Sequence, residues 1–321
     1  MLTLKQVAQI DGRPHRVELS ADGRWVALRY GSEWRMFDAL TRQESGIIHL
    51  PDSHWATVSP NGTALANMRD GVIRVAHLDG RQVVKMYTYP GVQHYGDDVC
   101  FTADSQQLWA TLCNDDGSGK LALLDAVTLE EITFVPMPKV RPDDFDYWSE
   151  PHSILHIPSD TLALHHAGGD HLIGVFFFKH HDRQIAQQKL FISPSASFRT
   201  MHYISFSASG QLMAGIDGPF VWVWRLVDMQ LLGRGLENLL DIDNENDEFG
   251  VLTFLGEQLI IEIGGESRDE LCIVDIPNEA VLTRCPMPPD FHAGADCINP
   301  LRGQTLVGMK GDDVVIYRIG L

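Results

Sequence analysis

The sequence predicts an all-β fold assembled from repeated units of antiparallel strands, and three observations lead to this prediction. Residues 201–226 hold three short runs rich in β-branched and aromatic residues, and turns at 207–211 and 217–218 separate them. Such a pattern is typical of a β-meander. Similar strand-turn-strand units recur along the whole chain, and the chain begins with a strand that has no unit of its own.

The repeat has a regular period. Residues of equivalent position, in the strand that follows the first turn of each unit, are Ala27, Ala66, Trp109, Ala163, Ala214, Ile260 and Val307. The intervals run from 39 residues, between Ala27 and Ala66, to 54 residues, between Trp109 and Ala163. This period is close to that of four-stranded propeller blades. We therefore predict a seven-bladed β-propeller of four-stranded antiparallel blades that forms a single domain over residues 1–321.

The units follow one another in the same internal order. Their expected strands include residues 17–19, 25–27 and 34–38; 56–58, 65–66 and 72–75; 99–101 and 121–125; 155–157 and 175–178; 252–255 and 271–274; and 297–300 and 314–317. A fourth, more polar strand follows in units one to six, for example at 82–86 and 280–283. The copies become less regular toward the end of the chain.

The two ends of the chain complement each other. The last unit stops at Leu321 without a fourth strand, whereas residues 2–10 form a strand outside any unit. Pairing this strand with the last unit would remove two open sheet edges, which proteins avoid because such edges aggregate. We predict that residues 1–10 are the closing strand of the last blade.

Short motifs resemble a known repeat class. The turn Ser59-Pro60-Asn61-Gly62, the turn Asp70-Gly71 before a β-branched strand, and Phe37-Asp38 at the end of a third strand are similar to repeats of WD40-type and YVTN-type β-propellers. The Gly-His and Trp-Asp dipeptides of WD40 repeats are missing, so only the broad class is named. The resemblance implies that loops entering the innermost strand, and loops joining the second and third strands, surround the mouth of a central channel where ligands bind.

Composition limits the partners. The chain carries 25 Lys and Arg against 43 Asp and Glu, a formal net charge of −18, which repels phosphate backbones and predicts no nucleic-acid partner. An acidic surface favours a cationic protein or peptide, and it also serves solubility alone. No apolar run reaches about 18 residues, so we expect no membrane association. Five cysteines without CxxC spacing favour the reducing cytoplasm.

Two acidic stretches are candidates for partner binding. The long insertion 136–151 mixes prolines with acids and aromatic residues, and its candidates are Asp143, Asp144, Phe145, Tyr147 and Trp148. Exposed aromatic residues favour a contact surface, although they could instead fold over the channel mouth as a plug. The second stretch contributes Asp241, Asp243 and Asp247. It lacks the glycine and glutamate of a calcium-binding EF-hand loop, so the alternative is an ordinary acidic surface loop.

Histidines and carboxylates define candidate channel-mouth and metal positions. His15, His54 and His202 each lie five residues before the turn serine of their unit, and Asp97 lies nearby in the third unit. Such residues could form a metal or anion site, or each could hydrogen-bond a neighbouring blade. His165, His166, Asp170 and His171 are the densest histidine cluster and a weaker metal candidate. Gly168-Gly169 within that cluster favours a solvated turn.

The function that these observations predict is a non-enzymatic protein-interaction scaffold without a cofactor. Its partner would be a basic protein or peptide, received by an acidic loop face around the channel mouth. No GxSxG, HExxH or complete phosphate-loop motif occurs, and no catalytic residue is predicted. The alternative is a metal-dependent propeller hydrolase or lactonase, with Ca or Zn held by residues such as Asp97 and His54.

Overall fold

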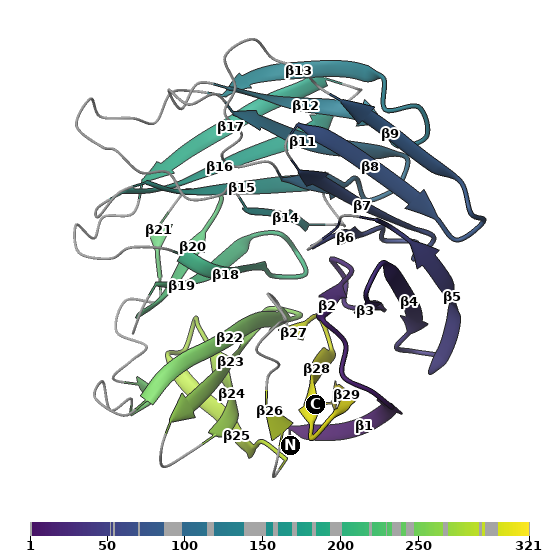
Figure 1. Ribbon diagram of the computed structural model, residues 1–321. Coiled ribbons are helices and arrows are strands. Elements are labelled where there is room, and N and C mark those ends of the chain that lie inside the picture. Colours follow the sequence, from purple (N-terminus) through teal and green to yellow (C-terminus); the bar gives the residue numbers. More distant parts are fainter. Residues whose placement is uncertain are drawn as a thin grey trace. The chain divides into compact units, whose positions relative to one another are not determined.

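Antiparallel β-strands make up nearly all the regular structure of the computed structural model (Figure 1). The structure describes residues 2–51, 53, 55–69, 71–86, 98–113, 119–137, 152–156, 160–168, 172–181, 184–192, 201–217, 220–228, 230–232, 239–241, 247–265, 269–288, 291–292 and 301–320. All the statements below concern these residues.

Six sheets have four strands each, in the order in which the strands follow along the chain. The first three are β2 (Arg16–Leu19), β3 (Trp25–Tyr30), β4 (Glu33–Asp38) and β5 (Gln43–His49); β6 (Thr57–Val58), β7 (Ala64–Arg69), β8 (Val72–His77) and β9 (Gln82–Met86); and β10 (Val99–Phe101), β11 (Gln107–Cys113), β12 (Gly119–Asp125) and β13 (Glu131–Met137).

The other three four-stranded sheets follow the same order. They are β14 (His152–His156), β15 (Thr161–Gly168), β16 (Leu172–His181) and β17 (Gln184–Ile192); β18 (Met201–Phe206), β19 (Leu212–Asp217), β20 (Phe220–Arg225) and β21 (Gln230–Leu231); and β22 (Asp247–Leu255), β23 (Gln258–Gly265), β24 (Asp269–Asp275) and β25 (Ala280–Pro286).

The last sheet corrects the predicted blade count. It has five strands, β1 (Thr3–Ile10), β29 (Asp313–Gly320), β28 (Thr305–Lys310) and β26 (Phe291–His292) in that order, with β27 (Leu301–Arg302) also paired to β28. The prediction of seven four-stranded blades is therefore wrong, because the structure has six. The strand predicted at 297–300 lies outside the described residues, and two short strands flank that segment. Two short strands, β26 and β27, pair with β28 where the prediction had one inner strand, and β1 adds a further strand, so this sheet has five strands rather than four.

The predicted pairing of the chain ends is confirmed. β1 runs antiparallel to β29, from Thr3 opposite Gly320 to Ile10 opposite Val314, with a register shift between Gln6 and Ala8. Figure 1 shows the purple N-terminal strand beside the yellow C-terminal one. Leu2 and Ile319 are buried in the same apolar cluster. The first strand of the chain therefore supplies an outer strand to the last sheet.

The aligned repeat positions are also equivalent in the structure. Each of them is the third residue of the second strand in its repeat, as in β7 (Ala64–Arg69) and β23 (Gln258–Gly265). Ala66 lies opposite Val75 and Ile260 lies opposite Ile273, so the cross-strand register is the same. The period read from the sequence therefore reflects a true structural repeat.

The chain divides into two compact units, which are described separately. Unit 1 comprises Met1–Arg24, Ala39–Gln43 and Thr200–Leu321, and unit 2 comprises Trp25–Asp38 and Glu44–Arg199. In unit 1, one apolar cluster joins sheet β18–β21 to sheet β22–β25, and a second joins β22–β25 to the five-stranded sheet. In unit 2, one cluster joins β6–β9 to β10–β13. The prediction of a single domain over residues 1–321 stays a prediction.

The serine turns of the repeats have a shared construction. In unit 2, the Ser59 hydroxyl donates to Asn61 Oδ1 at 2.9 Å and accepts from the Ala64 amide at 2.9 Å. Gly62 has a φ of 71°, and a Cβ there would lie 2.1 Å from the Trp25 ring. Only glycine therefore fits this turn.

Turns of neighbouring sheets bind each other. In unit 1, the Ala208 amide donates to the Gly256 carbonyl at 2.8 Å, and the Ser209 amide donates to Glu257 Oε1 at 2.9 Å. These contacts align one end of sheet β18–β21 with the same end of sheet β22–β25. The opposite ends, where the second strand turns into the third, are consequently aligned as well.

Candidate functional site

A buried glutamate interrupts an apolar strand in unit 1. Glu262 on β23 is only 6% exposed. Its neighbours Ile261 and Ile263 face sheet β18–β21, whereas Ile260 packs toward the five-stranded sheet. Because side chains alternate along a strand, Glu262 shares the face of Ile260. A carboxyl group is thus placed within an apolar interface between two sheets of the same unit.

A β-bulge in the adjacent strand accommodates this carboxyl group. Phe249 pairs with Ile263 and Leu252 pairs with Ile261, so Gly250 and Val251 of β22 both lie opposite Glu262. The Val251 amide donates a hydrogen bond to the Glu262 carboxylate. A Cβ on Gly250 would lie 2.6 Å from Glu262 Oε2, so the carboxyl group rests directly against the backbone at Gly250. Bulges of this kind often occur at functional sites.

The second oxygen of Glu262 has no hydrogen-bond partner among the described residues. Oε2 is buried and unpaired. Burial raises the pKa of Glu262 to about 7, the Asp269 carboxylate adds to the rise, and the Val251 hydrogen bond opposes it. A buried acceptor without a donor is unfavourable, so this oxygen is suited to receive a donor from outside.

Space for a side chain is present on the same face of the sheet at Gly264. Gly264 lies two residues further along β23, on the same face, and a Cβ there would meet no heavy atom within 4 Å. Gly264 pairs with the exposed Asp269 at the start of β24. The two carboxylates therefore lie on one face of the sheet, with Asp269 at its rim, Glu262 deeper, and a residue without a side chain between them.

Charged residues are distributed unevenly between the two ends of the unit 1 sheets. At the end that carries the β23–β24 and β28–β29 links, the described links and adjoining strand ends contain the acidic residues Asp11, Asp217, Asp241, Asp247, Asp269, Asp312 and Asp313, together with the basic residues Arg13, Arg16 and Lys310. At the serine-turn end, acidic and basic residues are nearer to balance: Asp22, Asp228, Glu257, Asp275 and Glu279 accompany Arg24, Arg42, Arg225 and Arg302.

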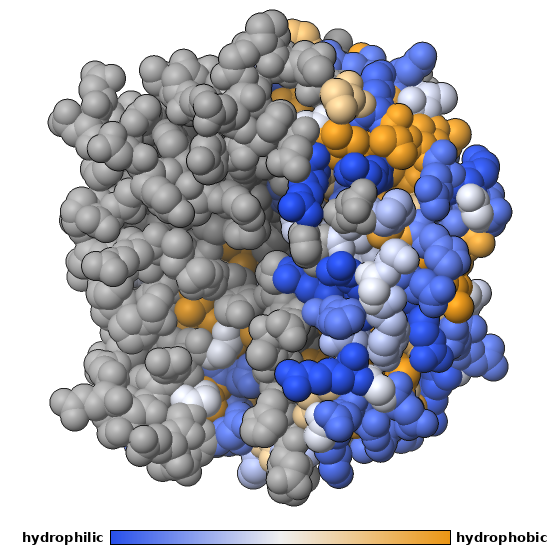
Figure 2. Space-filling view, in the orientation of Figure 1, coloured by the Kyte–Doolittle hydropathy of each residue, from blue (hydrophilic) through white to orange (hydrophobic). Residues whose placement is uncertain are grey.

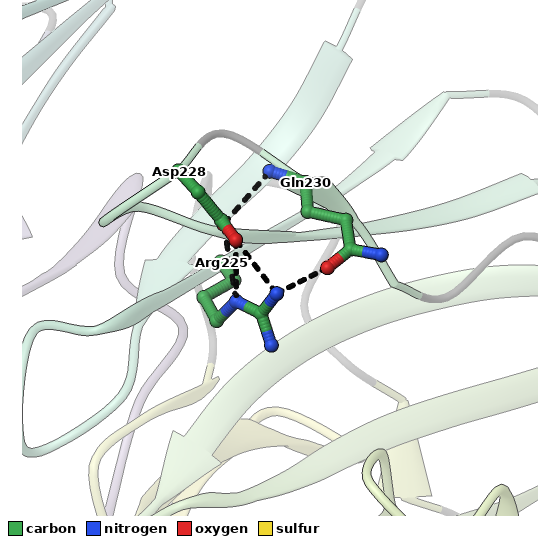
Figure 3. Close-up of polar contacts among 3 residues, drawn as sticks. All are labelled: Arg225, Asp228 and Gln230. Atoms are coloured by element: carbon green, nitrogen blue, oxygen red, sulfur yellow. Dashed lines mark hydrogen bonds and ion pairs between the residues drawn. The ribbon is translucent and has the colours of Figure 1, made fainter.

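Figure 3 shows how a carboxylate at the serine-turn end is neutralised. The Arg225 guanidinium at the end of β20 binds Asp228 at 2.7 Å and also contacts Gln230. This ion pair lowers the pKa of Asp228 to about 2. It closes the turn between β20 and β21, and it is a structural contact rather than a binding site.

The predicted partner-binding residues are only partly within the described chain. Asp241 is exposed, with a φ of 55°, in a turn that buried Leu240 anchors to the core of unit 1. The Leu240 carbonyl accepts a 3.0 Å hydrogen bond from Arg284 of β25. Asp247 is the first residue of β22. The remaining partner candidates, Asp143, Asp144, Phe145, Tyr147, Trp148 and Asp243, lie outside the described residues.

The predicted histidine sites remain predictions. His15 is exposed and immediately precedes β2, and His202 lies in β18 opposite Ile216. His165 and His166 are consecutive residues of β15. The remaining candidates, His54, Asp97, Asp170 and His171, fall outside the described residues. The described portion of the chain contains no group of three His, Cys, Asp or Glu side chains that could hold a metal ion.

Sequence reasoning missed Glu262, although a signal was present. The residues 259–263 read Leu-Ile-Ile-Glu-Ile, so a single acid stands inside an apolar run. Read as a strand, this pattern places the acid on a buried face. The sequence does not show that Gly250 and Val251 lie opposite, because that pairing depends on a bulge.

Exposed hydrophobic side chains gather on outer strands of unit 2. Val84 and Met86 on β9, and Ile132 and Phe134 on β13, are all exposed. Figure 2 shows hydrophobic residues at the upper right, over the region where Figure 1 places β9 and β13. The Lys120 ammonium lies 4.9 Å from the centre of the Phe134 ring.

No family model and no curated protein matches the chain. Among solved structures, Kuenenia stuttgartiensis hydrazine synthase is 12% identical, with a TM-score of 0.60 and 96% of each chain covered. The β-propeller domain of Myceliophteria thermophila Cps50 (Swd1) is 16% identical, with a TM-score of 0.51, 85% of this chain and 83% of that chain covered. The chain has a WD40-like β-propeller fold.

At these identities the similarity establishes the fold of the propeller alone. Function must be argued from its residues. In the described part of the propeller, no helix is long and apolar enough to cross a membrane.

Proposed function

We propose that this propeller is a non-enzymatic protein-interaction scaffold that binds a basic protein or peptide. Binding takes place at the end of the unit 1 sheets that carries the β23–β24 and β28–β29 links. The observation that carries the proposal is the excess of acidic residues there: seven acidic residues accompany three basic ones, Arg13, Arg16 and Lys310, in the described links and adjoining strand ends.

This charge distribution has a direct physical consequence. A cluster of carboxylates at one end of a rigid scaffold attracts a cationic partner, accelerates its association and disfavours acidic competitors. The formal net charge of −18 acts in the same sense and makes nucleic acid an unfavourable partner. Loops held by a rigid β-scaffold are also where binding residues concentrate in proteins generally.

The proposed compartment is the cytoplasm. Cys100, Cys272 and Cys285 form no disulfide bond, and the first two are buried. Burial raises the pKa of the Cys285 thiol, which makes it less reactive. Cysteines outside disulfide bonds are typical of proteins in a reducing environment.

The proposal is tested with a lysine-rich peptide and its glutamate-rich counterpart, by calorimetry at increasing salt. We expect the basic peptide to bind. Its affinity should fall steeply between roughly 50 and 300 mM NaCl, because salt screens the attraction between exposed charges. The triple variant D11N/D241N/D312N should bind at least about tenfold more weakly, a loss of about 1.4 kcal/mol.

The matched control is E130Q/E257Q/E279Q, which removes the same number of charges from serine-turn ends. It should bind the basic peptide as the native protein does. Equal losses in both triple variants would show that only total charge matters, and no binding of the basic peptide to the native protein would refute the scaffold proposal.

A further inference from the structure

We propose that Glu262 and Asp269 form a specific site for a cationic side chain of the partner, an arginine guanidinium or a lysine ammonium, which enters beside Gly264. This inference rests on the proposed function and deepens it. It converts a general acidic surface into one defined recognition site in sheet β22–β25.

The first support is the vacant hydrogen-bond capacity of Glu262. One carboxylate oxygen is occupied by the Val251 amide, whereas buried Oε2 has no donor among the described residues. An arginine side chain offers several N–H donors in a planar fork that matches a carboxylate. Such a donor would satisfy Oε2 and neutralise the buried charge together.

The second support is that the sheet's own arginine is engaged on the opposite face. Arg284 of β25 forms an ion pair with Glu270 and donates to the Leu240 carbonyl. Arg284 lies opposite Cys272, and Glu270 lies opposite Ile263. Both Cys272 and Ile263 belong to the cluster that faces sheet β18–β21. Glu262 lies opposite Leu271, on the other face, so Arg284 cannot serve as its partner.

The third support is a route that suits a long cationic side chain. Asp269 at the rim would attract the charge, and the space beside Gly264 would admit the side chain. Leu271, which lies opposite Glu262 on the same face, is buried and apolar. It would pack against the aliphatic stem of an arginine or lysine while its head group reaches Glu262.

The absence of a side chain at Gly250 leaves room for the Glu262 carboxyl group in the buried part of the site. Any side chain at that position would collide with Glu262 Oε2, since a Cβ would lie 2.6 Å away. At Gly264 the opposite holds, because a Cβ would meet nothing within 4 Å. One glycine thus fits the carboxyl group closely, whereas the other leaves the approach to it open.

The test uses hexa-arginine and hexa-lysine peptides with hexa-citrulline as a neutral probe, and it measures affinity by calorimetry for the full-length protein. Hexa-arginine should bind the native protein and hexa-citrulline should not. E262Q keeps the size of the side chain, removes its charge and should weaken hexa-arginine binding at least about tenfold. G264V retains both carboxylates but fills the approach, and it should weaken binding to a similar extent.

E257Q is the matched control, because it removes one carboxylate from the serine-turn end of the same sheet. Native affinity for hexa-arginine in both E262Q and G264V would overturn the site while leaving the scaffold proposal intact. Failure of hexa-arginine to bind the native protein would overturn both. If E262Q does not fold, G264V alone decides, since no charge or hydrogen-bonding group is altered.

Discussion

Thr111 of unit 2 and Glu262 of unit 1 occupy the same place in their repeats, two residues beyond Trp109 and Ile260 respectively, yet their surroundings differ. The Thr111 hydroxyl accepts from the Asp98 amide at 2.8 Å and donates to the Asp98 carbonyl at 3.2 Å. Glu262 accepts one hydrogen bond and leaves Oε2 unpaired.

The inner strands account for this difference. β10 pairs with β11 without a register shift, so its backbone meets the short threonine side chain. β22 bulges at Gly250 and Val251, which makes room for a longer and charged side chain. At the same repeat position, one side chain is therefore fully hydrogen-bonded to the backbone of Asp98, whereas the other has an acceptor oxygen without a donor among the described residues.

Removing residues 1–10 should affect the Glu262 region far more than the Thr111 region. The deletion removes β1 and buried Leu2, and so uncovers the apolar cluster that also contains Ile260 and Leu271. We expect the melting temperature to fall by at least about 10 °C, on the scale of several kcal/mol lost from a protein of this size. Hydrogen exchange should show protection lost first in β22–β23 and β28–β29. The control K5A, at an exposed position of β1, should melt normally; an unchanged melt of the deletion variant would refute the closing role.

The stability of E262Q relative to the native protein should depend on pH. The pKa of Glu262 rises from an ordinary 4.5 to about 7 on folding, so between these values the folded state binds more protons than the unfolded state. Native stability therefore falls as pH rises through this window. At pH 8 the isosteric amide should be more stable by up to about 3 kcal/mol, at about 1.4 kcal/mol per unit of pKa. Near pH 4.5 the advantage should vanish. Urea titrations at both pH values measure the difference in unfolding free energy between E262Q and the native protein. A difference that does not change with pH would contradict the raised pKa of Glu262.

A methyl group at Gly250 should be poorly tolerated and one at Gly264 well tolerated. G250A places a Cβ 2.6 Å from Glu262 Oε2, and the overpacking should cost about 1–3 kcal/mol of unfolding free energy. G264A should change stability by less than about 0.5 kcal/mol, as at an open site. The double variant G250A/E262A should recover part of the loss, because the colliding group is gone. Equal effects of G250A and G264A in urea unfolding would show that the bulge does not fit the carboxyl group closely.

Replacing Thr111 tests the repeat position at which the side chain is fully hydrogen-bonded. T111V removes a buried hydroxyl that bonds both the amide and the carbonyl of Asp98, so it should cost about 1–2 kcal/mol. Because no charge changes, the loss should be the same at pH 5 and pH 8, in contrast to E262Q. If the loss of unfolding free energy in T111V depended on pH, the pH dependence at Glu262 could not be assigned to its carboxyl group.

The sequence predicted the repeat well because each unit carries its own local signals. The aligned positions from Ala27 to Val307, the serine turns and the closing strand all follow from periodicity and turn chemistry, which depend on neighbouring residues. The number of four-stranded blades was wrong because the described strands of the last unit form a five-stranded sheet, in which the short strands β26 and β27 both pair with β28. The regular spacing of the repeat does not reveal how many strands its last sheet contains.

The candidate site was less accessible to sequence reasoning. Loop acids such as Asp241 were found because polar runs between strands are visible in the sequence. Glu262 was missed because its importance arises from the packing of sheet β22–β25 on the five-stranded sheet and from the bulge at Gly250. Neither the partner across the strand nor the hydrogen-bond deficit of Oε2 can be read from residues 259–263 alone.

Titration of the Glu262 carboxyl carbon, observed by NMR on protein labelled at glutamate and assigned by comparison with E262Q, shows whether this carboxyl group is an open acceptor. We expect a pKa of about 7 in the free protein. Hexa-arginine should move it toward the ordinary value, because a bound guanidinium stabilises the carboxylate. A pKa near 4.5 in the free protein, or a raised pKa that hexa-arginine leaves unchanged while it binds, would contradict the assignment of Glu262 as an open acceptor for a cationic side chain.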